Sequence, residues 1–151
     1  IAVWQPVANQ ALKAVAGSKI IYSSQDKSGL IYDTLTVNMT HLAAHQEEWK
    51  KIIQVWDKTV KFIQDPATHD EAVQIMANKV GVDPKQYAQF IGGTHLLDLE
   101  ANKKVFRQGT GFDSIYGSSY HVNQFNVTNG VYTTKQDVDG LIVPTLFESL
   151  K

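Results

Sequence analysis

A stripe of apolar residues between positions 49 and 63 constrains the fold of this chain more than any other feature. The stripe ends at Asp65-Pro66, and helical backbone is disfavoured at the residue before a proline. An amphipathic helix of this length buries one face against other elements, so we expect helix packing to form much of the core. The residues of the stripe recur at helical spacings: Trp49, Ile52, Ile53, Trp56, Val60 and Ile63.

Several shorter helices are predicted after the stripe. Thr68 and Glu71 have the spacing of a capping box, and the helix that they begin should end at Gly81. Asp83-Pro84 is typical of a helix start, with an N-cap carboxylate followed by proline at the first helical position. Asp98 is expected to cap another helix. The second half of the chain is therefore predicted to be mainly helical.

The C-terminal third carries weaker patterns. The segment from Asp113 to Val127 is apolar enough for a helix, but Gly117 should interrupt it because glycine is a poor helix former. The tail from Val138 to Leu150 is expected to end in a short helix after Pro144.

The first 37 residues have a different character. Apolar residues after Pro6 share one helical face up to Gly17, which predicts a helix over Pro6–Ala16. Lys19–Tyr22 and Leu30–Val37 are rich in β-branched and aromatic residues and predict two strands, separated by a polar loop. Together with the helices, these strands predict a helix-rich α/β fold.

Four residues beside these elements are candidates for one wall of a small-molecule pocket. Trp4 and Gln5 directly precede a helix N-terminus, where concave α/β sites collect polar groups. Asp33 follows Tyr32 where the chain enters a strand, and a carboxylate in such a place needs a cation or hydrogen-bond donors. The alternatives are a turn carboxylate bound by nearby backbone N–H groups for Asp33, and a core aromatic for Trp4.

Composition excludes several classes of function. The 151 residues can bury one core, and the net charge of −1 without a basic stripe disfavours nucleic acid as a partner. The absence of cysteine removes disulfides, thiolate catalysis and Cys-based metal sites. His41 and His45 have metal-ligand spacing, but position 42 is leucine, so the glutamate of the metalloprotease motif is missing. We expect no metal and no cofactor.

The ends of the sequence and its hydropathy add two expectations. No apolar run reaches the roughly 18 residues needed to cross a bilayer, and no charged-then-apolar leader is present. The sequence opens without methionine in the strand-like run Ile1–Trp4, so we expect a mature or truncated chain.

Six short segments follow one another in an order that is informative. They are Val3-Trp4-Gln5-Pro6, Gly17-Ser18-Lys19-Ile20-Ile21, Tyr32-Asp33-Thr34-Leu35-Thr36-Val37, Asp65-Pro66, Gly81-Val82-Asp83-Pro84 and Gly92-Gly93-Thr94-His95-Leu96-Leu97. Taken in this order, they resemble the later half of ABC-importer solute-binding proteins of the taurine, alkanesulfonate and nitrate group. The last segment looks most like taurine-binding members.

The resemblance implies the later portion of a type II periplasmic-binding-protein fold with few strands. Residues 1–24 correspond to the end of the second lobe, residues 25–29 to a crossover loop, and residues 30–151 to a returning strand and the C-terminal helices of the first lobe. Asp33 looks like the carboxylate that meets the ammonium group of taurine, and Trp4 falls at the Trp-x-Pro position of the family.

The same resemblance implies function, location and partners. Family members bind a small zwitterion or sulfonate in a cleft between two lobes, deliver it to a membrane permease, and are periplasmic or lipid-anchored in the cell envelope. The first half of the family pattern is absent, so this chain is expected to carry only part of the site. An unpaired strand edge could then lead to self-association.

Two other classes of function remain as alternatives. A pyrimidine-synthesising enzyme family shares the general fold, but it is characterised by a cysteine-containing motif that this chain lacks. A helix-rich interaction module that assembles with itself or with a partner chain is the other alternative. We prefer the hypothesis that the chain is a non-catalytic binding protein.

Overall fold

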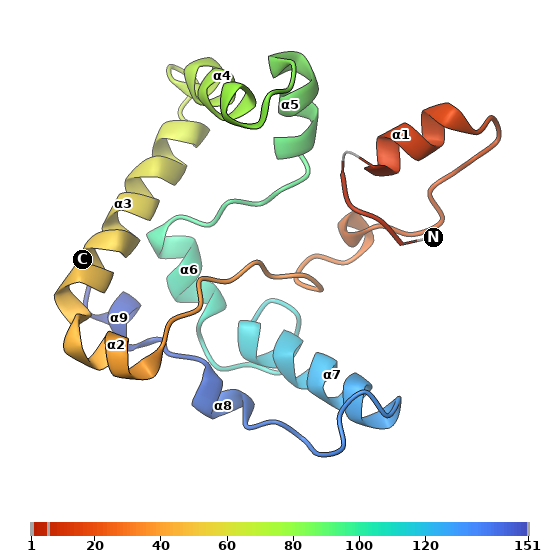
Figure 1. The fold of residues 1–151 in the computed structure, drawn as a ribbon. Coiled ribbons are helices and arrows are strands. Elements are labelled where there is room, and N and C mark those ends of the chain that lie inside the picture. The colour runs from red at the N-terminus through yellow and green to blue at the C-terminus, as the bar shows by residue number, and fades with distance from the viewer. Residues whose placement is uncertain (1, 6, 151) are drawn as a thin grey trace. The chain divides into compact units, whose positions relative to one another are not determined.

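The computed structural model describes residues 2–5 and 7–150, which form helices joined by extended segments (Figure 1). Helices account for 57% of the chain, and the described residues contain no strand and no sheet. The elements, in order, are α1 (Val7–Ala14), the 3-10 turn η1 (Ser24–Asp26), α2 (Met39–Ala44), α3 (Gln46–Gln64), α4 (His69–Val80), α5 (Pro84–Ile91), α6 (Leu99–Val105), α7 (Ile115–Thr128), α8 (Val138–Leu141) and α9 (Thr145–Glu148).

The prediction of an α/β, periplasmic-binding-protein type of fold is therefore wrong. Neither Lys19–Tyr22 nor Leu30–Val37 forms a strand. β-branched residues favour extended backbone, but a strand exists only when a second chain segment supplies the partners of its N–H and C=O groups. Among the described residues no segment pairs with either of them, so neither becomes a strand, and Ile21 is 89% and Leu35 68% exposed.

The chain divides into two compact units. The first contains residues 1–26 and 62–96, and the second contains residues 27–61 and 97–151. Helix α3 contributes its last turn to the first unit and the rest of its length to the second. The division into parts that the resemblance implied, with boundaries at residues 24 and 29, stays a prediction.

The first unit packs α4 against α5. Ala72, Val73 and Ala77 form the buried face of α4. Gly81 adopts the predicted left-handed conformation at the C-terminus of α4, with φ at 72°, and its N–H donates to the carbonyl of Ala77. Asp83 accepts hydrogen bonds from two backbone N–H groups at the start of α5, as predicted.

The predicted capping box at Thr68 is only half right. The helix does begin at His69, but the Thr68 side chain makes no capping hydrogen bond. Its hydroxyl donates instead to the carbonyl of Phe62, 2.6 Å away. A free carbonyl at the end of α3 competes for the same hydroxyl, and the tight turn at Asp65 brings it within reach.

The second unit is held together where α3 meets the start of α6. One Asp57 carboxylate oxygen accepts from the backbone N–H of Leu99 at 2.9 Å, and the other binds Lys61 at 2.7 Å. The neighbouring indole N–H of Trp56 donates to the carbonyl of Leu97 at 2.8 Å. Asp98 caps α6 through the N–H of Ala101, as predicted. Adjacent side chains of α3 thus position the first turn of α6.

These polar contacts lie beside the apolar core of the second unit. Ile53 of α3, Leu99 of α6 and Leu150 after α9 form a buried cluster, against which Leu146 and Phe147 pack. The predicted stripe on α3 is therefore only partly internal: Ile53 and Val60 are buried, whereas Ile52 and Trp56 are each 45% exposed.

Helix α7 runs through Gly117 without the interruption that we predicted. A Cβ at position 117 would lie 2.2 Å from the carbonyl oxygen of Gly111 and 2.5 Å from a backbone carbon of Thr110. The glycine therefore serves close packing of the helix against a loop rather than a break. Ser114 caps the helix. The short helix predicted after Pro144 is present as α9.

Replacing Gly117 by alanine should destabilise the protein although alanine favours helix. The clash with rigid backbone costs about 1–3 kcal/mol, which exceeds a propensity gain of about 1 kcal/mol. We expect urea unfolding to show a loss of about 1–2 kcal/mol. Gly92→Ala is the control, because its Cβ would meet nothing nearer than 3.4 Å. Equal stability of Gly117→Ala and the parent would contradict the packing described here.

The hydrogen bonds of Asp57 lead us to expect that the protein loses stability in acid. Two hydrogen bonds lower the pKa of the Asp57 carboxyl below 3.8. The bond from Lys61 has the larger effect, and the bond from the Leu99 N–H comes second. A lowered folded-state pKa gives stability that is present above 3.8 and is lost as the pH falls through the folded-state pKa. We expect urea unfolding of Asp57→Ala at neutral pH to show a loss of about 1–2 kcal/mol, and a smaller further loss than the parent on acidification. An unchanged acid dependence would contradict this role.

Candidate functional site

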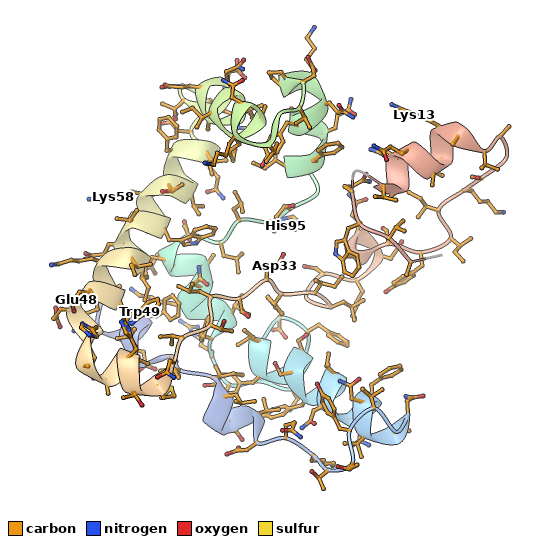
Figure 2. All side chains as sticks on the ribbon, in the orientation of Figure 1. Lys13, Asp33, Glu48, Trp49, Lys58 and His95 are labelled. Carbon is orange, nitrogen blue, oxygen red and sulfur yellow. The ribbon has the colours of Figure 1, made fainter. Side chains whose placement is uncertain are left out.

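The predicted ligand residue Asp33 lies on an extended segment of the second unit, between η1 and α2 (Figure 2). Residues 31–38 have no regular secondary structure. Long-range hydrogen bonds hold the N-terminal end of the segment, and Asn38 at its C-terminal end caps α2.

The N-terminal end of the segment is anchored at Gly29 and Tyr32. The Gly29 carbonyl accepts a hydrogen bond from the hydroxyl of Ser118 at 2.7 Å, and the Tyr32 hydroxyl donates to the carbonyl of Phe112 at 2.8 Å. Gly29 has φ at 83°, and a Cβ there would lie 1.8 Å from the Phe112 oxygen. Only glycine fits so close an approach of two backbones.

Lys27 and Asn38 make two further contacts on either side of the segment. The Lys27 ammonium lies 5.4 Å from the centroid of the Phe112 ring, within cation–π range. At the C-terminal end, the Asn38 side chain accepts from the N–H groups of Thr40 and His41 and so caps α2. Tyr32 is half-buried. Burial is the main cause that raises the pKa of its phenol, and the negative charge of Asp113 is the second cause.

The Asp33 carboxylate itself is exposed. Within the described part of the chain it accepts no hydrogen bond from a turn N–H and pairs with no cation, unlike Asp26, Asp83 and Asp98, which all bind backbone N–H groups. Asp33 therefore offers a free anionic group on an anchored segment.

Trp4 and Gln5 lie in the first unit, immediately before α1. Trp4 is 76% exposed, so it does not act as a core aromatic there. Gln5 is engaged with its own helix: its amide donates to the Asn9 side chain at 3.3 Å and accepts from the Asn9 N–H at 3.4 Å. The predicted helix start at Pro6 lies outside the described residues. Of the four predicted site residues, Trp4 and Gln5 therefore lie in the first unit and Tyr32 and Asp33 in the second, and each pair is adjacent only as sequence neighbours.

The two histidines His41 and His45 contact each other and a neighbouring indole. His41 and His45 stack with ring centroids 4.3 Å apart, and the indole N–H of Trp49 donates to His41 at 3.1 Å. No group of three or more potential metal ligands occurs in the described residues. His95, in the loop after α5, is exposed.

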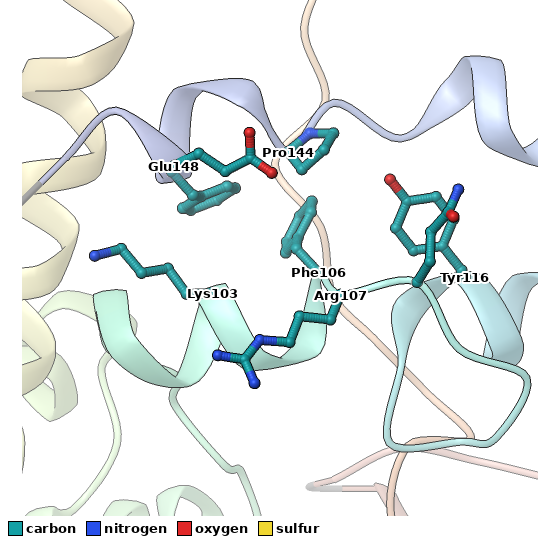
Figure 3. A pocket seen from close by; sticks show the side chains of 8 residues that line it. Lys103, Phe106, Arg107, Tyr116, Pro144 and Glu148 are labelled. Carbon is teal, nitrogen blue, oxygen red and sulfur yellow. The ribbon is translucent and has the colours of Figure 1, made fainter.

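Sequence reasoning did not find an open hollow of about 590 Å³ in the second unit, between α6, α7 and α9 (Figure 3). Its walls include Phe106, Pro144 and Phe147, and its polar side chains include Arg107, Tyr116 and Glu148. Little in the sequence indicates this hollow, because its lining residues are distributed over 46 positions and share no motif.

Across residues 2–5 and 7–150, no helix is both long enough and apolar enough to cross a membrane. No family model, no curated protein and no solved structure matches the chain.

Proposed function

We propose that the chain is the substrate-binding component of an ABC importer and that Asp33 binds the ammonium group of a small amino-sulfonate such as taurine. The observation that carries this proposal is the free carboxylate of Asp33 on a segment anchored at Gly29, Tyr32 and Asn38. The ordered motifs that resemble taurine-binding proteins supply the class of ligand.

The chemistry of the carboxylate fits the cationic end of such a ligand. An ammonium donates up to three hydrogen bonds, and a charge-assisted bond to a carboxylate is roughly twice as strong as a neutral one. Tyr32, the residue before Asp33, is held by its hydrogen bond to Phe112, which lowers the cost of ordering the backbone there on binding. The role is recognition and not catalysis.

The sulfonate end of the ligand needs cationic or N–H donors that Asp33 cannot provide. In this proposal those donors lie outside the Asp33 segment, as in the family half that the chain does not resemble. Trp4 and Gln5 stay predicted ligand contacts on sequence pattern alone. The proposed partner is a membrane permease, and the proposed location is the periplasm or a lipid anchor in the cell envelope.

A second candidate function is assembly with another copy of the chain. Residues 31–37 make no backbone hydrogen bond within the described part of the chain, and Ile31 and Leu35 expose 58% and 68% of their surface. Extended backbone with unpaired N–H and C=O groups and exposed apolar residues is a template for strand pairing. This observation favours an interaction module.

The ligand proposal is tested by calorimetry on full-length protein with Asp33→Asn. We expect taurine affinity to fall about 10- to 100-fold, because one charge-assisted hydrogen bond is lost. Ethanesulfonate, which lacks the amine, should lose much less. Asp70→Asn, an exposed carboxylate in the first turn of α4, is the control. Equal losses for the two ligands would remove the assignment of Asp33.

The assembly proposal is tested by light scattering over a range of concentrations. We expect a concentration-dependent dimer that Leu35→Lys returns to the monomer, because a charged residue on an exposed edge opposes strand pairing. Leu141→Lys changes a residue of similar exposure on α8 and should leave the dimer intact. A parent protein that stays monomeric throughout would exclude this function.

A further inference from the structure

Asn129 and Gly130 form a pair that can react without an enzyme. The backbone nitrogen of the glycine attacks Cγ of the asparagine and loses its proton, a C–N bond forms, and the side-chain nitrogen takes up a proton and leaves as ammonia. Water then opens the cyclic imide to aspartate or isoaspartate. Glycine permits the attack because no side chain hinders its nitrogen. Of the asparagines in the chain, only Asn129 precedes a glycine.

The pair lies at the C-terminal end of α7, where the chain turns toward α8 (Figure 1). Asn129 directly follows the last residue of the helix and is exposed, and Gly130 has φ at 72°. The N–H groups of Val131 and Tyr132 both donate to the carbonyl of Asn126, at 2.8 and 3.1 Å. Water therefore reaches the pair, but the backbone around it is held by hydrogen bonds.

Three features of this turn oppose the attack. The side-chain amide of Asn129 donates to the carbonyl of Phe125 at 2.8 Å. The attacking nitrogen of Gly130 donates its N–H to the carbonyl of Val127 at 3.2 Å. The ψ of Asn129 is 9°, so the Gly130 nitrogen lies on the side of the Asn129 backbone nitrogen and away from Cβ and Cγ. Closing the imide ring therefore requires the last turn of α7 to open.

We infer that Asn129 is a deamidation site whose rate is set by the opening of the last turn of α7, and that the modification weakens this turn irreversibly. The carboxylate product cannot donate to the Phe125 carbonyl as the amide does. It also places a negative charge at a helix C-terminus, where the helix dipole is already negative. The inference does not depend on the proposed transport function.

The test is peptide mapping by mass spectrometry after incubation at mildly alkaline pH, with one sample folded and one in urea. Opening the turn breaks two hydrogen bonds, so we expect conversion at position 129 to be about tenfold or more slower in the folded protein. Equal rates in the two samples would overturn the inference. Conversion in urea that is no faster at position 129 than at the other asparagines would also overturn it.

A variant at position 130 checks the chemistry of the attack. Asparagine tolerates the left-handed conformation, and a Cβ at this position would meet nothing within 4 Å. Gly130→Asn should therefore fold like the parent but slow the conversion at position 129 in urea, because its side chain hinders the attacking nitrogen. An unchanged rate in urea would exclude attack by this nitrogen.

Variants in the last turn of two helices test control by the fold. Val127→Gly should speed the conversion of the folded protein severalfold, because glycine weakens the end of α7. Val80→Gly makes the same change in the last turn of α4 and should leave the rate unchanged. Asn129→Asp should melt roughly 1–4 °C below Asn129→Ala, which loses the same hydrogen bond without gaining a charge. A folded-state rate that Val127→Gly does not change would contradict control by this turn.

Discussion

The contact between α3 and the start of α6 is the interaction on which the second unit depends. Asp57 satisfies a backbone N–H that the first turn of a helix leaves without an intrahelical partner, and Trp56 satisfies a carbonyl two residues earlier. Both side chains come from one turn of α3, so they set the position of α6. The apolar cluster around Ile53 and Leu99 then excludes water beside them. The hydrogen bonds that position α6 and the burial of apolar side chains therefore occur at the same place.

A second constraint is the close approach of the Gly29 region to the loop before α7. Phe112 accepts from Tyr32, stacks on His121 with centroids 4.6 Å apart, and approaches Gly29 too closely for any side chain there. These contacts hold the start of the extended segment that carries Asp33, whose carboxylate is exposed.

The sequence predicts the helices of this chain better than its extended parts. Caps at Asp83 and Asp98 and the left-handed glycine at 81 act locally, so short motifs identify them. Strand formation depends on a pairing partner that a local pattern cannot supply, and the predicted strand at Leu30–Val37 stays extended for that reason. At Gly117 the prediction of a helix interruption was wrong, because the glycine is needed for close packing against a loop six residues earlier.

The candidate site was predictable only in part. A carboxylate beside an aromatic predicted Asp33 as a ligand contact, and that stays a prediction. The hollow at Tyr116 is lined by residues of α6, α7 and α9 and of the loops beside them, whose approach no spacing encodes. A crystal structure of the protein with taurine is the most direct test of the proposal that Asp33 is a ligand carboxylate. We expect the ligand ammonium to lie within about 2.7–2.9 Å of an Asp33 oxygen. A taurine bound elsewhere, with the Asp33 carboxylate occupied by backbone N–H groups, would contradict it.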